Sequence, residues 1–155
     1  MVSERELAMR LGYPSPIHPD IESTHAAYNA GVEFVIEQQA QYPRQNDSIK
    51  ALALVVASHN NHSVDYTCGL MEKYGIPRSG GWVAFGQLMG MRDGTAYRLA
   101  GNGFKALKIV PYGPVEVAIA YLHRRAQENA AMIGAMKKDM NAIASELKFR
   151  VGLQQ

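Results

Sequence analysis

Three short runs rich in apolar residues, each ended by a turn and followed by helical spacing, constrain the fold of this chain most strongly. The runs occupy residues 51–57, 82–85 and 105–110. The first is continuously apolar and ends abruptly in polar residues, which is typical of a strand covered on both faces. Strands that alternate with helices pair in parallel through right-handed crossovers, as in an α/β layer or a (β/α) barrel. Three strands do not close a barrel of eight, so the sequence predicts an α/β fold with an open parallel sheet.

Helical periodicity predicts the rest of the chain. The expected helices cover residues 3–11, 20–41, 62–74, 93–99, 114–129 and 132–147. In the helix over residues 114–129, Val115, Ile119 and Leu122 share one face, and we expect this face to be buried.

Composition narrows the class of protein. Hydrophobic residues make up 47% of the 155 residues and charged residues 19%, which favours a globular domain over a disordered chain. No apolar run approaches the roughly 20 residues that a transmembrane helix needs, and we expect neither such a helix nor a targeting peptide in this chain. The net charge of +2 does not indicate nucleic-acid binding. The single cysteine, Cys68, excludes an internal disulfide, and its place on an apolar stripe indicates a structural thiol rather than a nucleophile.

Polar residues that follow the apolar runs are the first candidates for a site, because parallel α/β proteins bind ligands at the carboxyl ends of their strands. Ser58, His59 and Asn60 follow the first run, and Gln87 lies just beyond the second. Two interpretations stay open for the first group: a turn that caps the next helix, or hydrogen bonding to a cofactor or substrate. His59 and His62 have no third ligand at a suitable spacing, so we expect no metal site.

A second candidate lies on the helix over residues 114–129. Tyr121, Arg124, Arg125 and Glu128 share an arc opposite its apolar face. A solvated charged face explains this pattern, and so does a carboxylate clamp. In the second interpretation two guanidinium groups bind an anionic head group while the aromatic ring covers an apolar ligand body.

Four motifs resemble the carboxyl-terminal part of the proline dehydrogenase (proline oxidase) family. In chain order they are VASHN at residues 56–60, FGQLMGM at 85–91, VPYGP at 110–114 and YLHRRAQEN at 121–129. The stretch GYPSPI at residues 12–17 is similar to the segment after the fifth barrel strand in eukaryotic members. The resemblance covers almost the whole chain.

The resemblance implies FAD-dependent oxidation of L-proline to 1-pyrroline-5-carboxylate, with FAD held at the carboxyl face of a (β/α)8 barrel. Electrons would pass to a quinone. Eukaryotic members lie on the matrix side of the mitochondrial inner membrane. A chain without a transmembrane segment would contact that membrane peripherally. Residues 1–155 would form the carboxyl-terminal portion of this domain. Residues 1–50 would be a helical segment after the fifth strand, residues 51–130 three strand-helix units, and residues 131–155 a carboxyl-terminal helix.

The resemblance also implies roles for individual residues. The proline pocket would be formed by Arg124 and Arg125, which bind the carboxylate, and by Tyr121 and Leu88, which form walls. The flavin contacts would come from the strand ends: Ser58, His59, Asn60 and Gln87. Glu128 matches an acid that orients the arginines.

Two departures from the family pattern leave alternatives open. Ile109 stands where proline-specific members usually have Tyr and hydroxyproline-acting relatives have Ser, so a hydroxyproline dehydrogenase relative is an alternative. Five of the eight barrel strands are not in this sequence, nor are the family's upstream active-site Asp, Lys and Arg. We therefore expect a fragment that is inactive alone, or a short non-catalytic protein that binds a small carboxylate or a partner chain.

Overall fold

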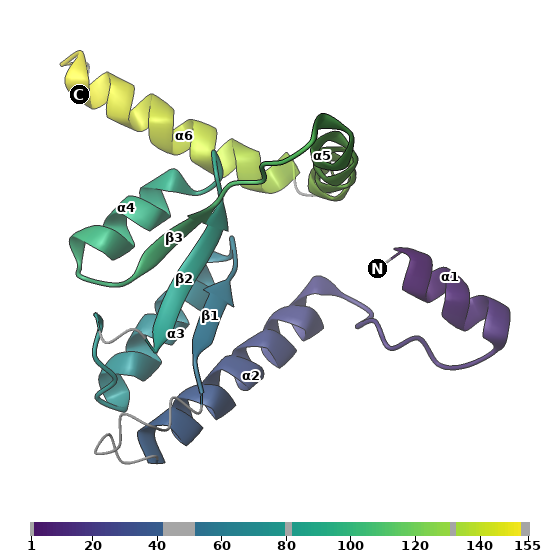
Figure 1. Ribbon diagram of the computed structural model, residues 1–155. Helices are drawn as coiled ribbons and strands as arrows, with labels where there is room; N and C mark the ends of the chain where they lie inside the picture. Colours follow the sequence, from purple (N-terminus) through teal and green to yellow (C-terminus); the bar gives the residue numbers. More distant parts are fainter. Residues whose placement is uncertain (1, 42–51, 80–81, 131–132, 153–155) are drawn as a thin grey trace.

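The computed structural model describes residues 2–41, 52–79, 82–130 and 133–152 (Figure 1). The helices are α1 (Val2–Leu11), α2 (Ile21–Gln41), α3 (Asn61–Lys73), α4 (Asp93–Gly101), α5 (Val115–Ala130) and α6 (Ile133–Arg150). The strands are β1 (Leu54–Ala57), β2 (Val83–Leu88) and β3 (Ala106–Ile109). The predicted alternation of strands and helices is confirmed. The helix expected over residues 132–147 corresponds to α6, and Met132 lies outside the described residues.

The three strands form one parallel sheet in the order β1-β2-β3. Val56 pairs with Phe85, and Phe85 pairs in turn with Ala106, so these three side chains form one row across the sheet. The middle strand extends past the predicted end at Phe85 to Leu88, because Gly86 aligns with Ala57 of β1 and Leu88 with Ile109 of β3. Gln87 and Leu88, which were expected just beyond the second strand, are therefore part of β2.

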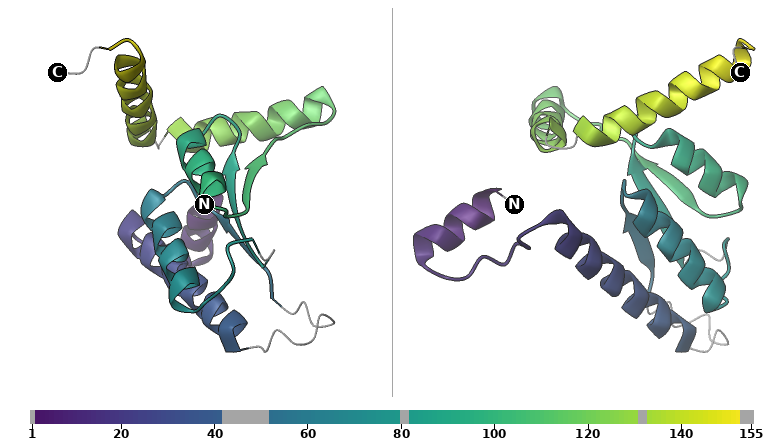
Figure 2. Two further views of the ribbon diagram at one scale, coloured as in Figure 1. Left: turned by 90° about the vertical axis from the view of Figure 1, so that its left-hand side faces the viewer. Right: turned by 180° about the vertical axis from the view of Figure 1, so that it is seen from behind.

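The core lies between the sheet and helices α2, α3 and α4, which cover one face (Figures 1 and 2). Its fully buried side chains include Ile36 from α2, Val64 and Met71 from α3, and Phe85 from β2. The Phe85 ring meets Phe104 edge to face, with 5.7 Å between the centroids. Burial of these apolar groups is the main force that holds the helices on the sheet.

Helix α3 is fixed at its start and along its side. Asn60 is its N-cap: the side-chain oxygen accepts from the backbone N–H of His62 at 3.1 Å. Against α2, the hydroxyl of Tyr66 donates to Glu33 (2.8 Å). The hydroxyl of Tyr74 donates to Glu37 in the same way (2.7 Å). The cap and these two bonds set the position of α3 against α2 and the sheet.

Two burial predictions are wrong. Residues 54–57 are not covered on both faces, because the helices pack on one face only and Val55, on the other, is 56% exposed. The apolar face of α5 is also open: Val115, Ile119 and Leu122 are 69%, 60% and 50% exposed. Helix α5 lies beyond the carboxyl ends of the strands rather than on the sheet (Figure 1). Its stripe therefore has no sheet surface to pack on.

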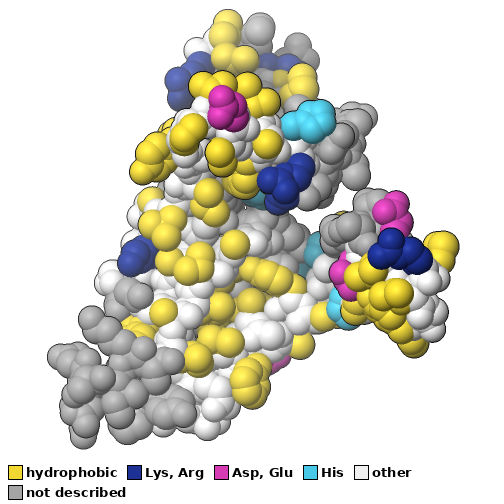
Figure 3. All heavy atoms as spheres, turned by 45° about the vertical axis from the view of Figure 1, so that its right-hand side comes forward, with side chains coloured by type: hydrophobic (Ala, Val, Ile, Leu, Met, Phe, Trp, Pro, Cys, Tyr) yellow, Lys and Arg dark blue, Asp and Glu magenta, His cyan; other side chains and the backbone are white. Residues whose placement is uncertain are grey.

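Hydrophobic side chains extend over the face of the sheet that the helices leave open (Figure 3). Val55, Leu107 and Ile109 contribute to it, one or two from each edge strand. Gly86 lies between them, since a Cβ built at this glycine would come within 3.6 Å of Val55 and 3.8 Å of Ile109. We call this surface the open face of the sheet. The opposite, helix-covered face holds the core.

Within the described residues, no helix has the length and apolarity to cross a membrane. Cys68 is half-buried beside the core, and burial raises the pKa of its thiol. A raised pKa lowers the thiolate fraction, in keeping with a structural thiol.

Candidate functional site

The polar residues after β1 form a tight turn into α3. The hydroxyl oxygen of Ser58 accepts from the backbone N–H of Asn60 at 3.1 Å. The amide of Asn60 caps α3 through its oxygen and donates through its nitrogen to the Ser63 hydroxyl at 3.1 Å. The capping interpretation is therefore confirmed for Asn60. The flavin contacts predicted for Ser58 and Asn60 stay predictions, and Ser58 keeps a hydroxyl hydrogen that it can donate.

His59 joins the end of β1 to the end of β2. Its Nε2 accepts from the backbone N–H of Leu88 at 3.1 Å, so this nitrogen carries no hydrogen. Its backbone carbonyl accepts from Nε of Arg92 at 3.2 Å. Two predicted site residues, His59 and Leu88, are thus in direct contact although 29 positions separate them. The parallel sheet brings them together because β1 and β2 end at the same edge.

Gln87 and Leu88 point to opposite faces of β2, as successive residues of a strand must. Leu88 pairs with Ile109, so these two side chains lie side by side on the open face of the sheet. Gln87 lies on the helix-covered face, is 1% exposed, and neither polar atom of its amide has a hydrogen-bond partner in the described structure. The structure therefore places Leu88 beside Ile109 and separates Gln87 from both.

Lys108 was not among the residues predicted for the site. Its Nζ donates to the carbonyl of Met91 at 2.6 Å and to that of Leu88 at 3.4 Å, and it pairs with Asp93 Oδ1 at 2.6 Å. The signal available in the sequence is a lysine inside an apolar run, one position before Ile109. A cation at such a position needs partners nearby, and the turn after β2 supplies them.

Helix α5, which carries Tyr121, Arg124 and Arg125, lies beyond the carboxyl ends of the strands (Figure 1). The Arg125 guanidinium stacks over the Tyr121 ring, with 5.5 Å from its carbon to the centroid. Arg124 is exposed, and its Nε donates to the backbone carbonyl of Ala120 at 3.3 Å. Glu128 is on the same helix, but its side chain lies outside the described residues. A guanidinium that stacks on a ring keeps its N–H groups in a plane suited to bidentate recognition of a carboxylate.

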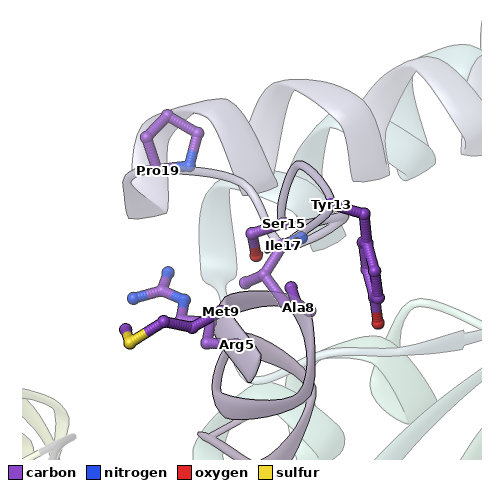
Figure 4. Close-up of a pocket in the computed structure, with 7 residues that line it drawn as sticks. All are labelled: Arg5, Ala8, Met9, Tyr13, Ser15, Ile17 and Pro19. Atoms are coloured by element: carbon purple, nitrogen blue, oxygen red, sulfur yellow. Dashed lines mark hydrogen bonds between the residues drawn. The ribbon is translucent and has the colours of Figure 1, made fainter. Parts of the chain in front are cut away.

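A separate hollow of about 590 Å³ lies between α1 and the connection to α2 (Figure 4). It is lined by Arg5, Ala8, Met9, Tyr13, Ser15, Ile17 and Pro19. The Arg5 guanidinium donates to the His18 carbonyl at 2.9 Å, which fixes the connection against α1. None of the predicted site residues lines this hollow.

The candidate residues fall into two groups: Leu88 beside Ile109 at the strand ends, and Arg125 stacked on Tyr121 on α5. The first group offers aliphatic surface, and the second offers charged donors beside a flat aromatic face. Among the described residues, no group of three or more His, Cys, Asp or Glu side chains is placed to hold a metal ion.

Comparisons with known proteins find relatives that match almost the whole chain. The chain is 39% identical over 97% of its length to proline dehydrogenase 2, mitochondrial, of Arabidopsis thaliana, and covers 30% of that protein. It is 35% identical over 97% of its length to proline dehydrogenase 1, mitochondrial, of Drosophila melanogaster, and covers 22% of it. It is also 35% identical, again over 97%, to hydroxyproline dehydrogenase of Xenopus laevis, and covers 31% of it. The chain thus spans between about a fifth and a third of the length of these relatives.

The fold has a solved counterpart. The crystal structure of proline utilization A from Bdellovibrio bacteriovorus, inactivated by N-propargylglycine, superposes with a TM-score of 0.68 at 25% identity. The match covers 83% of this chain and 12% of that protein. The model of the family described as proline dehydrogenase matches residues 1–138. This chain belongs to the proline dehydrogenase family.

Proposed function

We propose that this chain forms the carboxyl-terminal part of the (β/α)8 barrel of a proline dehydrogenase, which oxidises L-proline to 1-pyrroline-5-carboxylate. The observation that carries the proposal is the stacked Arg125 and Tyr121 pair, with Arg124 adjacent, at the carboxyl end of the parallel sheet. Proline presents a carboxylate beside the methylene groups of its ring. The Arg125 guanidinium offers charged donors to the carboxylate, and the Tyr121 ring offers an aromatic face to the methylene groups.

The residues at the strand ends fit a flavin. Gln87 has a buried amide with neither polar atom paired in the described structure, and a buried group of this kind is stabilised by a polar ligand or water. The Ser58 hydroxyl has a hydrogen to donate. Ser58, His59, Asn60 and Gln87 would hold FAD at this edge. FAD, when bound, supplies the redox chemistry by accepting hydride, and the protein supplies binding and orientation.

Each residue of the proposed site then has a definite task. Arg124 and Arg125 bind the carboxylate of the substrate. Tyr121 and Leu88 enclose the ring and exclude water from it. Exclusion of water strengthens the ion pair between arginine and carboxylate, because the effective dielectric falls.

The apolar side chain at position 109 favours proline over hydroxyproline. Ile109 lies beside Leu88 on the open face of the sheet and carries no group that bonds a hydroxyl. A hydroxyl buried against it would lose its bonds to water without replacement. The names of the relatives include both activities, so hydroxyproline is the second candidate substrate.

The names of the relatives also extend the proposal to location. The proline dehydrogenases of Arabidopsis thaliana and Drosophila melanogaster carry the word mitochondrial in their names. We propose the matrix side of the inner membrane, with electrons passed to a quinone during peripheral contact.

The test is a chimera in which residues 1–138 replace the matching segment of Arabidopsis thaliana proline dehydrogenase 2. In it, Arg125→Met removes charged donors but keeps an aliphatic stem, and the KM for proline should rise about 10- to 100-fold while bound flavin is unchanged. Arg98→Met is the matched control, since Arg98 is exposed on α4 and pairs with Asp65. Assays with proline and with trans-4-hydroxyproline decide the substrate. Unaltered proline kinetics in Arg125→Met would refute the role of the α5 arginines.

A further inference from the structure

The turn between β2 and α4, residues 89–92, is held in an unusual conformation. Arg92 has φ 53°, in the left-handed region that is unfavourable for a residue with a Cβ. It occupies the N-cap position of α4 without a side-chain cap bond. A strained residue of this kind persists only where its surroundings determine the path of the chain. The contacts that do so here come from both neighbouring strands.

Lys108 supplies the contacts from β3. Its side chain is 22% exposed, and one ammonium group meets three oxygens: the carbonyl of Met91, the carbonyl of Leu88, and a carboxylate oxygen of Asp93. These oxygens lie before, within and after the turn. Charge-assisted bonds of this kind are about twice as strong as neutral ones. Lys108 therefore fixes the turn at its beginning and at its end.

His59, two residues after the end of β1, supplies the contacts on the other side of the turn. The Arg92 Nε donates to the His59 carbonyl at 3.2 Å, and the His59 ring accepts from the Leu88 N–H at 3.1 Å. The position of the His59 ring thus depends on Leu88 and Arg92, and both depend on the turn that Lys108 holds. A chain of contacts runs from β3 through the turn to β1. It ends on two residues that the proposed function assigns to substrate and flavin.

We propose that Lys108 is a positioning residue for the site: it sets the path of residues 89–92 and thereby the placement of Leu88 and His59. The inference rests on the proposed function for its effect on substrate. The effect on the turn itself does not depend on that function. Lys108 acts through the turn and not by contact with the reacting atoms.

Backbone amide exchange in the 155-residue chain tests the effect on the turn. Lys108→Met keeps the aliphatic stem and removes the ammonium, and exchange at the amides of Leu88 and Met91 should rise about tenfold or more. The amides of Val56 and Phe85, in the middle of the sheet, should be unchanged. Asp93→Asn removes only the ion pair and should give a smaller rise in exchange at the same two amides. If Lys108→Met fails to fold, this variant tests whether Lys108 holds the turn. Lys105→Met is the matched control, since Lys105 is exposed and precedes the same strand.

Two exchange results would overturn the proposal: no change at Leu88 and Met91, or an equal rise throughout β2. The second would show that Lys108 stabilises the sheet as a whole.

Steady-state kinetics in the chimera test the effect on the site. Lys108→Met should raise the KM for proline about tenfold with kcat changed by less than about threefold, because Leu88 shifts in the substrate pocket while Ser58, Asn60 and Gln87 still hold the flavin and only the His59 contact weakens. Lys108→Arg, which keeps a cation, should restore most of the KM. Equal losses of kcat and bound flavin that Lys108→Arg does not restore would contradict a positioning role. A parent chimera that oxidises no proline would overturn the proposed function, and the exchange experiment would still decide whether Lys108 holds the turn.

Discussion

Helices α3 and α5 follow strands of the same sheet, and both carry an apolar stripe, yet only α3 is packed. Val64 on α3 is fully buried, whereas Val115 on α5 is 69% exposed. The two faces of the sheet differ in the same way, with Phe85 in the core and Leu107 on the open face. Amphipathic spacing thus predicts which face of a helix or strand is apolar. Whether that face is buried depends on a second surface, and here the helices provide one on one side only.

The largest effect should separate the two faces of the sheet. Phe85→Ala removes a fully buried ring that also meets Phe104, and we expect the free energy of unfolding to fall by about 3–5 kcal/mol. Leu107→Ala on the open face should cost less than about 1 kcal/mol, since a half-exposed side chain leaves no closed cavity. Urea unfolding followed by the fluorescence of Trp82, the one tryptophan, measures both. Equal losses would mean that the open face is covered in solution.

Sequence predicted the order of elements because it depends on local patterns. The apolar runs, the helical spacing after them and the N-cap at Asn60 are all visible within a few residues. The edge where Ser58, His59 and Leu88 meet was predictable too, since parallel strands end together. Burial of the α5 stripe was not, because it depends on elements far away in the sequence.

The turn after β2 shows the same limit inside the candidate site. Nothing local to Arg92 signals a left-handed backbone, which glycine would adopt more readily. That conformation depends on Lys108, 16 positions further along, and on His59, 33 positions before. The one local sign is Lys108, a charged residue between apolar ones, because a partly buried ammonium group needs hydrogen-bonding or charged partners. Its partners became evident only from the register of β2 and β3.

A matched substitution on the two helices sharpens the comparison. Val64→Ala should lower the free energy of unfolding by about 2 kcal/mol, from two lost carbons and the cavity they leave. Val115→Ala on the apolar stripe of α5 should leave it unchanged or raise it by about 0.5 kcal/mol, because the side chain is exposed and alanine has the higher helix propensity. The same urea titration gives both values. A loss for Val115→Ala as large as that for Val64→Ala would show that the stripe of α5 packs on another surface in solution.

The smallest effect concerns the side of α3 that meets α2, and it depends on pH. The hydrogen bond to the Glu33 carboxylate raises the pKa of Tyr66 above its usual value of 10, with smaller contributions from burial and nearby charges. The neutral phenol is therefore favoured in the folded state. Its contribution is complete below the pKa of the unfolded chain and is lost as pH rises through the higher pKa of the folded one.

Tyr66→Phe should accordingly cost about 0.5–1 kcal/mol at pH 7, and the difference from the unmodified chain should shrink above about pH 10. Tyr97→Phe is the control, since Tyr97 is exposed on α4, and it should leave stability unchanged at either pH. Urea unfolding at pH 7 and pH 10.5 provides the measurement. A cost for Tyr66→Phe that stays constant across this range would mean that the ring's packing, and not its hydroxyl, holds α3 against α2. The contrast between α3 and α5 would then rest on apolar contact alone.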